Sequence, residues 1–282
     1  MQEVNKSQRV VSVKAGRIVV FIICSVLAFG GCAQPRSDKP TLEAAKQVLK
    51  LRGYEFNEKA FFAAATASDL MAVNAFLDAG INPNAQDETS GMTVLISAAS
   101  RGQLEVVNAV LKGKANVNVK DKQGYTALFR ALQAHHEAVA DVLLTQQNLD
   151  LSARGLNGVT ALISYVWRDR KDAVQTLLER GADVNLQDHD GDTALHGAAL
   201  NGNVGILQML LAKDANPNVK NKVGGTPLMW AAVYGHEEAA RALLDHGADA
   251  SLKDEDGVTA AAWAAKNRRD EMVKLLRAAE SH

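Results

Sequence analysis

The sequence contains very little cysteine, and what it has lies near its start. Cys24 and Cys32 are the two cysteines of the 282-residue chain, and none follows Cys32. The segment after Cys32 therefore holds no internal disulfide and no cysteine nucleophile. A zinc site of the cysteine type is excluded there as well.

Two further shortages narrow the class of protein. The chain has 31 lysine and arginine residues and 32 aspartate and glutamate residues, so its net charge is -1. Residues 1–31 have a net charge of +3, which leaves a net charge of -4 for the rest of the chain. A mildly acidic body lacks the basic surface of a nucleic-acid-binding protein.

Aromatic residues make up only 5% of the chain, while alanine and leucine dominate its apolar fraction. This composition favours close-packed short helices, an all-α protein, over a sheet sandwich.

The first apolar run is short. It extends from Ile18 to Phe29 behind a basic segment, whereas a helix that crosses a bilayer needs about 20 residues. A basic segment followed by such a run is typical of a secretory signal peptide. Gly30-Gly31-Cys32 follows and resembles the lipobox of bacterial lipoproteins, although Phe29 stands where leucine is usual. The resemblance implies a signal peptide over 1–31 and a lipid on Cys32; an ordinary signal peptide or an uncleaved anchor remains open.

The residues after Cys32 indicate where the lipid would hold the chain. Ala33, not an acidic residue, follows the cysteine. By analogy with lipoprotein sorting in Gram-negative bacteria, this favours the outer membrane, facing the periplasm. Residues 32–40, which include two prolines, are interpreted as the lipidated cysteine and a short polar tether, so the folded part is expected close to the bilayer.

What the sequence has in abundance is repetition. A threonine two residues after a glycine recurs at intervals of 33, 34, 33, 33 and 33 residues, at Thr93, Thr126, Thr160, Thr193, Thr226 and Thr259. Each threonine precedes apolar residues spaced three and four apart, which share one face of a helix. Each unit ends in a string rich in glycine, asparagine and aspartate, which is typical of tight turns. A fixed period of this length indicates a stacked repeat architecture.

The registered strings, such as GDTALHGAA and GADVNLQD, resemble the ankyrin repeat. The resemblance covers residues 88–282 with six full units and implies two antiparallel helices per unit with a β-hairpin-like loop between units. Residues 57–87 align as a degenerate first unit, so the repeat domain is expected over 57–282. Thr193 and His196 match the family's TPLH element, which implies that they hydrogen-bond the loop and the helix start.

Both ends of the array carry features expected of caps. Residues 41–56 are predicted to form a capping helix, with Leu42, Ala45 and Leu49 on its apolar side and with Tyr54 and Phe56 covering the first unit. Arg277 stands where earlier units have leucine, which predicts a polar outer face. A solenoid needs such ends because each unit buries its apolar face only against neighbours.

Sequence motifs for catalysis are not found. The chain has no phosphate-binding glycine loop, nucleophile elbow or HExxH string, so we expect no enzyme activity, no cofactor and no metal site. His189 and His196 lie near Asp188, Asp190 and Asp192, where a metal site is conceivable. We interpret these residues instead as a loop tip and a family-type histidine.

The resemblance implies binding through the concave side, on loop tips and exposed residues of each first helix. The positions that transfer include aromatic and arginine residues, which dominate interface energies. The predicted partner-binding residues are Tyr125, Trp167, Arg168, His189, Lys222, Val233 and Tyr234. For the three aromatic residues among these, partial burial between units is the alternative. Trp230 and Trp263 are assigned to core packing.

The middle of the array departs from the repeat. The loop over 145–158 has one extra residue, and Tyr165-Val166 replaces an alanine pair. Specialisation for one partner or tolerated drift would each produce this.

The leading hypothesis is a monomeric, membrane-tethered protein–protein interaction module, an adaptor or an inhibitor, acting in the bacterial periplasm. A passive envelope spacer and a metal-binding or enzymatic envelope protein are the alternatives.

Overall fold

The computed structural model describes residues 41–280, and this region is built from helices. The predicted signal peptide (1–31) and the tether with Cys32 (32–40) lie outside the described residues. Within 41–280, no helix combines the length and the apolar character needed to cross a bilayer. The loops of this region contain two isolated β-bridges, Arg154 with Thr160 and Lys253 with Thr259.

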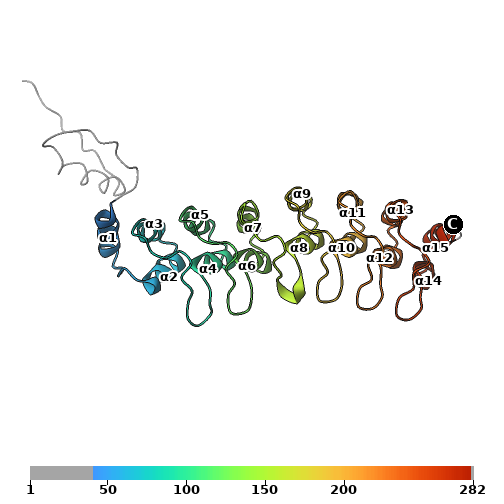
Figure 1. Cartoon of the computed structure of the whole chain (residues 1–282), viewed down its shortest axis with the longest axis horizontal. Coiled ribbons are helices and arrows are strands. Elements are labelled where there is room, and N and C mark those ends of the chain that lie inside the picture. The colour runs from blue at the N-terminus through green and yellow to red at the C-terminus, as the bar shows by residue number, and fades with distance from the viewer. Residues whose placement is uncertain (1–40, 281–282) are drawn as a thin grey trace, which may run out of the picture. The chain divides into compact units, whose positions relative to one another are not determined.

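After a first helix, α1 (Leu42–Leu51), the helices come in seven pairs (Figure 1). The first helices of the pairs form an inner row beside the loops: α2 (Glu58–Thr66), α4 (Val94–Ser100), α6 (Ala127–Gln133), α8 (Ala161–Trp167), α10 (Ala194–Asn201), α12 (Pro227–Tyr234) and α14 (Ala260–Lys266). The second helices form an outer row: α3 (Leu70–Asp78), α5 (Leu104–Lys112), α7 (Glu137–Leu144), α9 (Lys171–Glu179), α11 (Val204–Leu211), α13 (Glu237–Asp245) and α15 (Asp270–Glu280). The predicted solenoid of six units with a degenerate first unit is confirmed.

The recurrent threonines are helix N-caps. The Thr93, Thr160, Thr226 and Thr259 hydroxyls each accept a hydrogen bond from the backbone N–H three residues on, at 3.2–3.4 Å. Such a cap satisfies one of the donors left free at a helix start. Thr126 differs, since its buried hydroxyl has no partner among the described residues. The threonine spacing thus marks where the inner helices from α4 to α14 begin.

The core is continuous along the array. Buried side chains from Leu49 in α1 to Leu276 in α15 form one apolar cluster. The alanine pairs of α4, α10 and α12 are buried at 0–1% exposure, so neighbouring inner helices approach closely. Each unit therefore completes the core of the next, as the repeat pattern requires.

Both ends are capped. The helix α1 packs on α3, and the rings of Tyr54 and Phe56 lie 6.0 and 6.1 Å from that of Phe76. Ala45 and Leu49 are buried as expected, but Leu42, predicted on the same side, is 50% exposed. Leu42 is the first helical residue, and the partly buried Val48 packs on the core in its place. Arg277 is exposed on α15.

Successive loops are joined by backbone hydrogen bonds, with one interruption. A loop-tip N–H donates to a carbonyl of the preceding loop at Lys122 to Ser90 (3.0 Å), His189 to Asn157 (2.7 Å), Lys222 to Asp190 (2.9 Å) and Glu255 to Val223 (3.1 Å). No such bond in the described part of the chain joins the loop before α6 to the loop before α8. The latter loop contains the short 3₁₀ helix η1 (Leu156–Gly158) and the residue that lengthens the repeat. The inner helices α6 and α8 also pack less closely than the other neighbours of their row.

Candidate functional site

Three hollows follow one another on the inner row between α6 and α14. The first, between α6 and α8, measures about 380 Å³, the second about 220 Å³ and the third, between α12 and α14, about 270 Å³. Trp167 borders both the first and the second, and Trp230 borders both the second and the third. Because neighbouring hollows share an indole on their borders, we take the three together and name them the groove.

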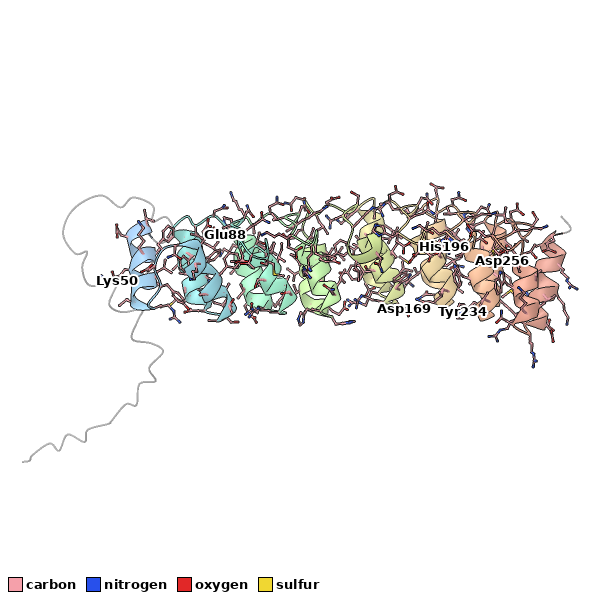
Figure 2. The ribbon with its side chains drawn as sticks, turned by 90° about the horizontal axis from the view of Figure 1, so that it is seen from below. Lys50, Glu88, Asp169, His196, Tyr234 and Asp256 are labelled. Atoms are coloured by element: carbon pink, nitrogen blue, oxygen red, sulfur yellow. The ribbon has the colours of Figure 1, made fainter. Side chains whose placement is uncertain are left out.

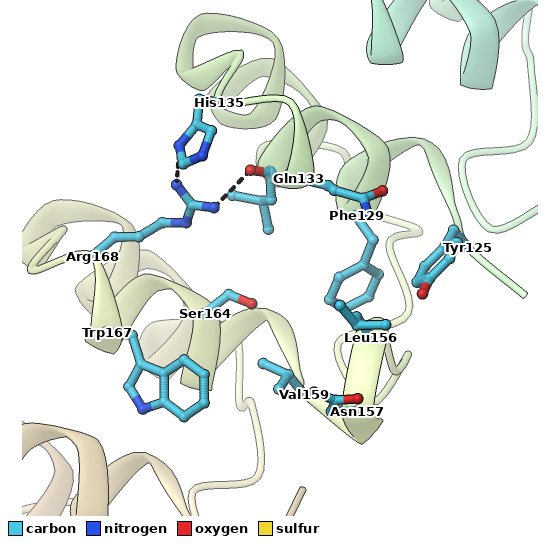
Figure 3. A pocket seen from close by; sticks show the side chains of 11 residues that line it. Tyr125, Phe129, Gln133, His135, Leu156, Asn157, Val159, Ser164, Trp167 and Arg168 are labelled. Atoms are coloured by element: carbon cyan, nitrogen blue, oxygen red, sulfur yellow. Dashed lines mark hydrogen bonds between the residues drawn. The ribbon is translucent and has the colours of Figure 1, made fainter. Parts of the chain in front are cut away.

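The α6–α8 hollow is lined mostly by apolar and aromatic side chains (Figure 3). Tyr125 and Phe129 come from one unit, and Leu156, Val159 and Trp167 come from the loop and helix of the next unit. Leu156 is 58% exposed and Trp167 is 49% exposed. A concave, largely apolar surface with a few polar groups is the usual form of a binding site.

The hollow opens where the repeat loses its alanine pair. Tyr165 and Val166 of α8, and Leu132 of α6, stand where other units have alanine, and all three are buried. Larger side chains hold the two helices apart. Burial raises the pKa of the Tyr165 phenol far above its usual value, and its hydroxyl has no partner among the described residues.

Polar bonds hold the widened junction together on the side of the helix ends. The Arg168 guanidinium donates to the Leu132 carbonyl (2.6 Å), to His135 Nδ1 (3.0 Å) and to Glu137 (3.3 Å). Arg170 donates to Glu137 (2.6 Å) and to Asp141 (3.0 Å). These contacts join α8 to the preceding unit. Arg168, predicted to bind a partner, therefore lies at the hollow but has its guanidinium engaged within the chain.

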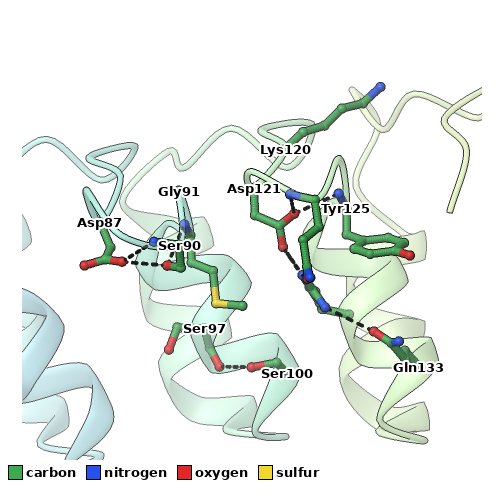
Figure 4. Close-up of polar contacts among 12 residues, drawn as sticks. Asp87, Ser90, Gly91, Ser97, Ser100, Lys120, Asp121, Tyr125 and Gln133 are labelled. Atoms are coloured by element: carbon green, nitrogen blue, oxygen red, sulfur yellow. Dashed lines mark hydrogen bonds and ion pairs between the residues drawn. The ribbon is translucent and has the colours of Figure 1, made fainter. Parts of the chain in front are cut away.

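Tyr125 is positioned by the loop that precedes α6 (Figure 4). The buried Asp121 accepts hydrogen bonds from the backbone N–H groups of Gln123 (2.9 Å) and Tyr125 (3.0 Å) through Oδ1. Its Oδ2 pairs with the Arg130 guanidinium, whose centre lies 4.5 Å from the Tyr125 ring. The ring is partly buried, and it forms one wall of the hollow.

The other predicted partner-binding residues occupy different parts of the same surface. His189 and Lys222 are exposed on loop tips. Val233 is half-buried and borders the third hollow. Tyr234 is 47% exposed at the end of α12 (Figure 2). Its ring stacks on that of Trp230, with the centroids 6.3 Å apart. The structure brings Tyr125, Trp167 and Arg168 together but leaves the remaining residues spread along the array.

Trp230 and Trp263, expected in the core, are half-buried instead. Both pack against the core and also border the third hollow. The Trp263 indole N–H donates to Asp254 Oδ2 at 2.7 Å. The sequence contains a signal that these two tryptophans are not core residues. They lie 33 residues apart at one position of the repeat, and other units have Arg130, Ser164 and Gly197 at that position. The position is therefore not uniformly apolar.

His196 is fully engaged inside the array. Its Nδ1 accepts from the Thr193 backbone N–H (3.1 Å) and faces the Thr193 hydroxyl (2.9 Å), while Nε2 lies 3.2 Å from the Gly225 carbonyl of the next loop. This arrangement fits a neutral imidazole with its proton on Nε2 and joins helix, loop and neighbouring unit, as the family resemblance implied.

The electrostatics of this cluster predict a pH dependence. Burial lowers the pKa of His196 below its usual 6.5, and the nearby Asp192 carboxylate offsets the effect only in part. His196 therefore takes up its proton at a higher pH in the unfolded chain than in the folded chain. As the pH decreases from about 6.5, the unfolded state is stabilised by this proton and the free energy of unfolding is expected to fall. The fall is at most about 1.4 kcal/mol per pH unit. Burial raises the pKa of Asp192, so protonation of this carboxylate stabilises the folded state. This effect has the opposite sign to that of His196 and acts at lower pH.

The measurement is the urea-unfolding midpoint between pH 7.5 and pH 5.5 for the wild type and for His196→Gln. Glutamine keeps a side chain able to complete the capping box at this position, but it does not titrate. The variant is expected to lose less stability on acidification than the wild type. Equal slopes in the two proteins would show that His196 does not carry the pH dependence.

A metal ion would need several suitable ligands in one place. In residues 41–280 no three histidine, cysteine, aspartate or glutamate side chains gather closely enough to hold one. His189 and His196 belong to the same unit, yet His189 is exposed on the loop tip and His196 is 2% exposed in the core. The two histidines of this unit are therefore not placed to share a ligand.

Comparison with known proteins matches this description. A family model described as ankyrin repeats (3 copies) matches residues 60–154 and 195–282, and one described as ankyrin repeats (many copies) matches 159–211. A putative ankyrin repeat-containing protein of Treponema pallidum (strain Nichols) is 34% identical over 140 residues, 49% of this chain and 46% of that protein. A putative ankyrin repeat protein of Rickettsia felis is 28% identical over 131 residues, 46% and 43% of the two chains. This chain thus spans less than half the length of these relatives.

Solved structures agree in fold. An ankyrin repeat domain from Acinetobacter baumannii AYE superposes with a TM-score of 0.60 at 28% identity, covering 66% of this chain and 96% of that one. The ankyrin repeat domain of Bcl-3, a member of the IkappaB protein family, superposes with a TM-score of 0.63 at 29% identity, covering 77% and 97%.

Proposed function

The chain belongs to the ankyrin-repeat family, and from that premise we propose that it is a membrane-tethered protein–protein interaction module of the bacterial envelope. The groove holds a partner protein, and a lipid on Cys32 keeps the module at the outer membrane, facing the periplasm. The module works as a monomer, an adaptor or an inhibitor, without catalysing a reaction.

The observation that carries this proposal is the α6–α8 hollow. A repeat array gains stability from close packing between every pair of units, yet this chain gives up packing at one junction and leaves Leu156 and Trp167 exposed there. Exposed apolar side chains grouped around a hollow mark interaction sites. A stable protein interface needs about 800 Å² on each side. The groove extends from this junction to α14, so a partner can contact several units at once.

The tether is supported by the sequence before the array. The apolar run followed by Gly30-Gly31-Cys32 is the feature expected of a lipid-modified cysteine. Holding a module at a membrane raises its effective concentration near partners on that membrane. The tether of residues 33–40 is short, so the groove meets partners that lie close to the bilayer.

Leu156→Asp is expected to abolish capture of the partner, because it places a charge inside the apolar hollow. The full-length chain is used as bait in detergent extracts of the membranes that contain it, and the captured proteins are quantified by mass spectrometry. The substituted side chain is exposed, so the melting temperature is expected to change little.

Leu51→Asp is the matched control, since Leu51 is 77% exposed at the end of α1, in the first part of the array. This variant is expected to capture the same proteins as the wild type. Cys32→Ser, which lacks the sulfur that would carry the lipid, is expected to move the chain from the membrane to the soluble fraction while leaving capture intact. If Leu156→Asp retains the wild-type set of proteins, the groove is not the binding surface.

A further inference from the structure

The third hollow combines two indoles with two carboxylates. It lies between α12 and α14 and measures about 270 Å³. Trp230 and Trp263 border it together with apolar side chains, and Asp254 and Asp256 border it from the last loop. The first two hollows lack this combination, since neither has more than one carboxylate on its border.

One of the carboxylates is fixed in place. Asp254 Oδ1 accepts hydrogen bonds from the backbone N–H groups of Asp256 (3.0 Å) and Val258 (2.8 Å), and Oδ2 accepts the Trp263 indole N–H (2.7 Å). Partial burial opposes ionisation of this group, but the hydrogen bonds outweigh it and hold the pKa of Asp254 below its usual value. The wall of the hollow therefore carries a fixed negative charge at neutral pH.

The other carboxylate is free. Asp256 is exposed, and among residues 41–280 no cation or hydrogen-bond donor pairs with its side chain. The Trp263 ring already accepts one cation, since the Lys266 ammonium lies 4.5 Å from its centroid. Lys266 does not border the hollow, so its charge does not fill it.

We propose that this hollow is a subsite for a basic side chain, lysine or arginine, of the protein that occupies the groove. The proposal rests on the proposed function, and it adds the chemistry by which one part of the partner is recognised. Aromatic faces attract cations through their quadrupoles, and the Asp254 and Asp256 carboxylates add attraction of the same sign. The methylene stem of lysine or arginine would pack against the indoles while its charged end meets the carboxylates.

The subsite can be tested without knowing the partner. The probes are Nα-acetyl-lysine amide, Nα-acetyl-arginine amide and the neutral analogue Nα-acetyl-norleucine amide. They are titrated into the full-length chain in a non-ionic detergent, and the indole N–H signals are followed by NMR. The chain has three tryptophans, so Trp→Phe variants assign all three signals. The cationic probes are expected to shift Trp230 and Trp263 saturably, more strongly at low salt, while Trp167 stays unchanged.

Charge removal provides the second measurement. Asp256→Asn is expected to weaken binding of the cationic probes about two- to five-fold, the range of a partly exposed ion pair. Asp245→Asn is the matched control because Asp245 is exposed on the outer helix α13, and it is expected to leave binding unchanged. The proposal is overturned if norleucine amide shifts the same signals equally, or if the cationic probes shift neither.

The outcome is separable from that of the proposed function. Leu156→Asp, which blocks the first hollow, is expected to leave probe binding unchanged. If the probes fail to bind while capture of a partner still depends on Leu156, the subsite is wrong and the groove stands. If the probes bind but no protein is captured through Leu156, the subsite stands and the proposed partner site in the first hollow is wrong.

Discussion

Replacing Phe76 with alanine is expected to lower the free energy of unfolding of the first units by about 3–5 kcal/mol, the usual cost of removing a buried phenylalanine. The Phe76 side chain on α3 is 0% exposed. Its ring centroid lies 5.5 Å from that of Phe61 in α2, 6.0 Å from Tyr54 and 6.1 Å from Phe56. This one side chain therefore joins the first helix pair to the segment that caps it.

The loss should remain local, because each unit of a solenoid contacts only its neighbours. All three tryptophans lie at or after Trp167, so tryptophan fluorescence reports on the later units, whereas circular dichroism reports on all helices. In Phe76→Ala the two probes are expected to separate, with part of the helical signal lost at lower urea than the fluorescence change. The wild type is expected to show a smaller separation.

Phe56→Ala is the control for this experiment. Phe56 stacks on the same ring but is 42% exposed. Its removal leaves a smaller buried cavity, so Phe56→Ala should lower the free energy of unfolding less than Phe76→Ala does. Coincident transitions in Phe76→Ala, with a loss no greater than that of Phe56→Ala, would contradict a first unit that depends on Phe76.

The repeat was readable from the sequence because its physical causes are local. In four of the six full units the threonine hydroxyl accepts a hydrogen bond from the backbone N–H three residues on, and where an alanine pair occurs it lies within the same helix. The exposure of Arg277 could be predicted because earlier units have leucine at the corresponding position. Leu42 was placed wrongly because its burial depends on whether the first helical turn of α1 reaches a neighbour, and helical periodicity carries no information on that.

The groove was only partly readable. The extra residue and the Tyr165-Val166 pair distinguish the junction between α6 and α8 in the sequence, but the separation of these helices also depends on Leu132 across the junction, 34 residues before Val166. The helical pattern places Trp230 and Trp263 on the inner helix face, which predicts core packing. Their exposure depends on the spacing between α12 and α14, together with the bond from Trp263 to Asp254 in the preceding loop.

Gly224→Ala is expected to destabilise the last units by about 2–5 kcal/mol, the sum of left-handed backbone strain and of overpacking. Gly224 has φ +75°, and a Cβ atom there would lie 2.7 Å from Glu255 N and 2.9 Å from the Cα and carbonyl carbon of Asp254. These are backbone atoms of the next loop, which is held to the Gly224 loop by the bond from Glu255 N–H to the Val223 carbonyl (3.1 Å). The loops must separate to admit a methyl group.

Gly124→Ala separates the two contributions. Gly124 stands at the equivalent position of an earlier unit and has φ +84°, but a Cβ atom there meets nothing within 4 Å, so this variant should lose only about 1–2 kcal/mol from strain. The difference between the two urea-unfolding energies measures how tightly the loops pack. Because Asp254 lies in the displaced loop, Gly224→Ala should also weaken binding of Nα-acetyl-lysine amide, whereas Gly124→Ala should not. Equal losses of stability in Gly224→Ala and Gly124→Ala would mean that the two loops can separate with no energetic penalty. In that case the loop that carries Asp254 would not be rigid enough to hold its carboxylate in place beside a bound cation.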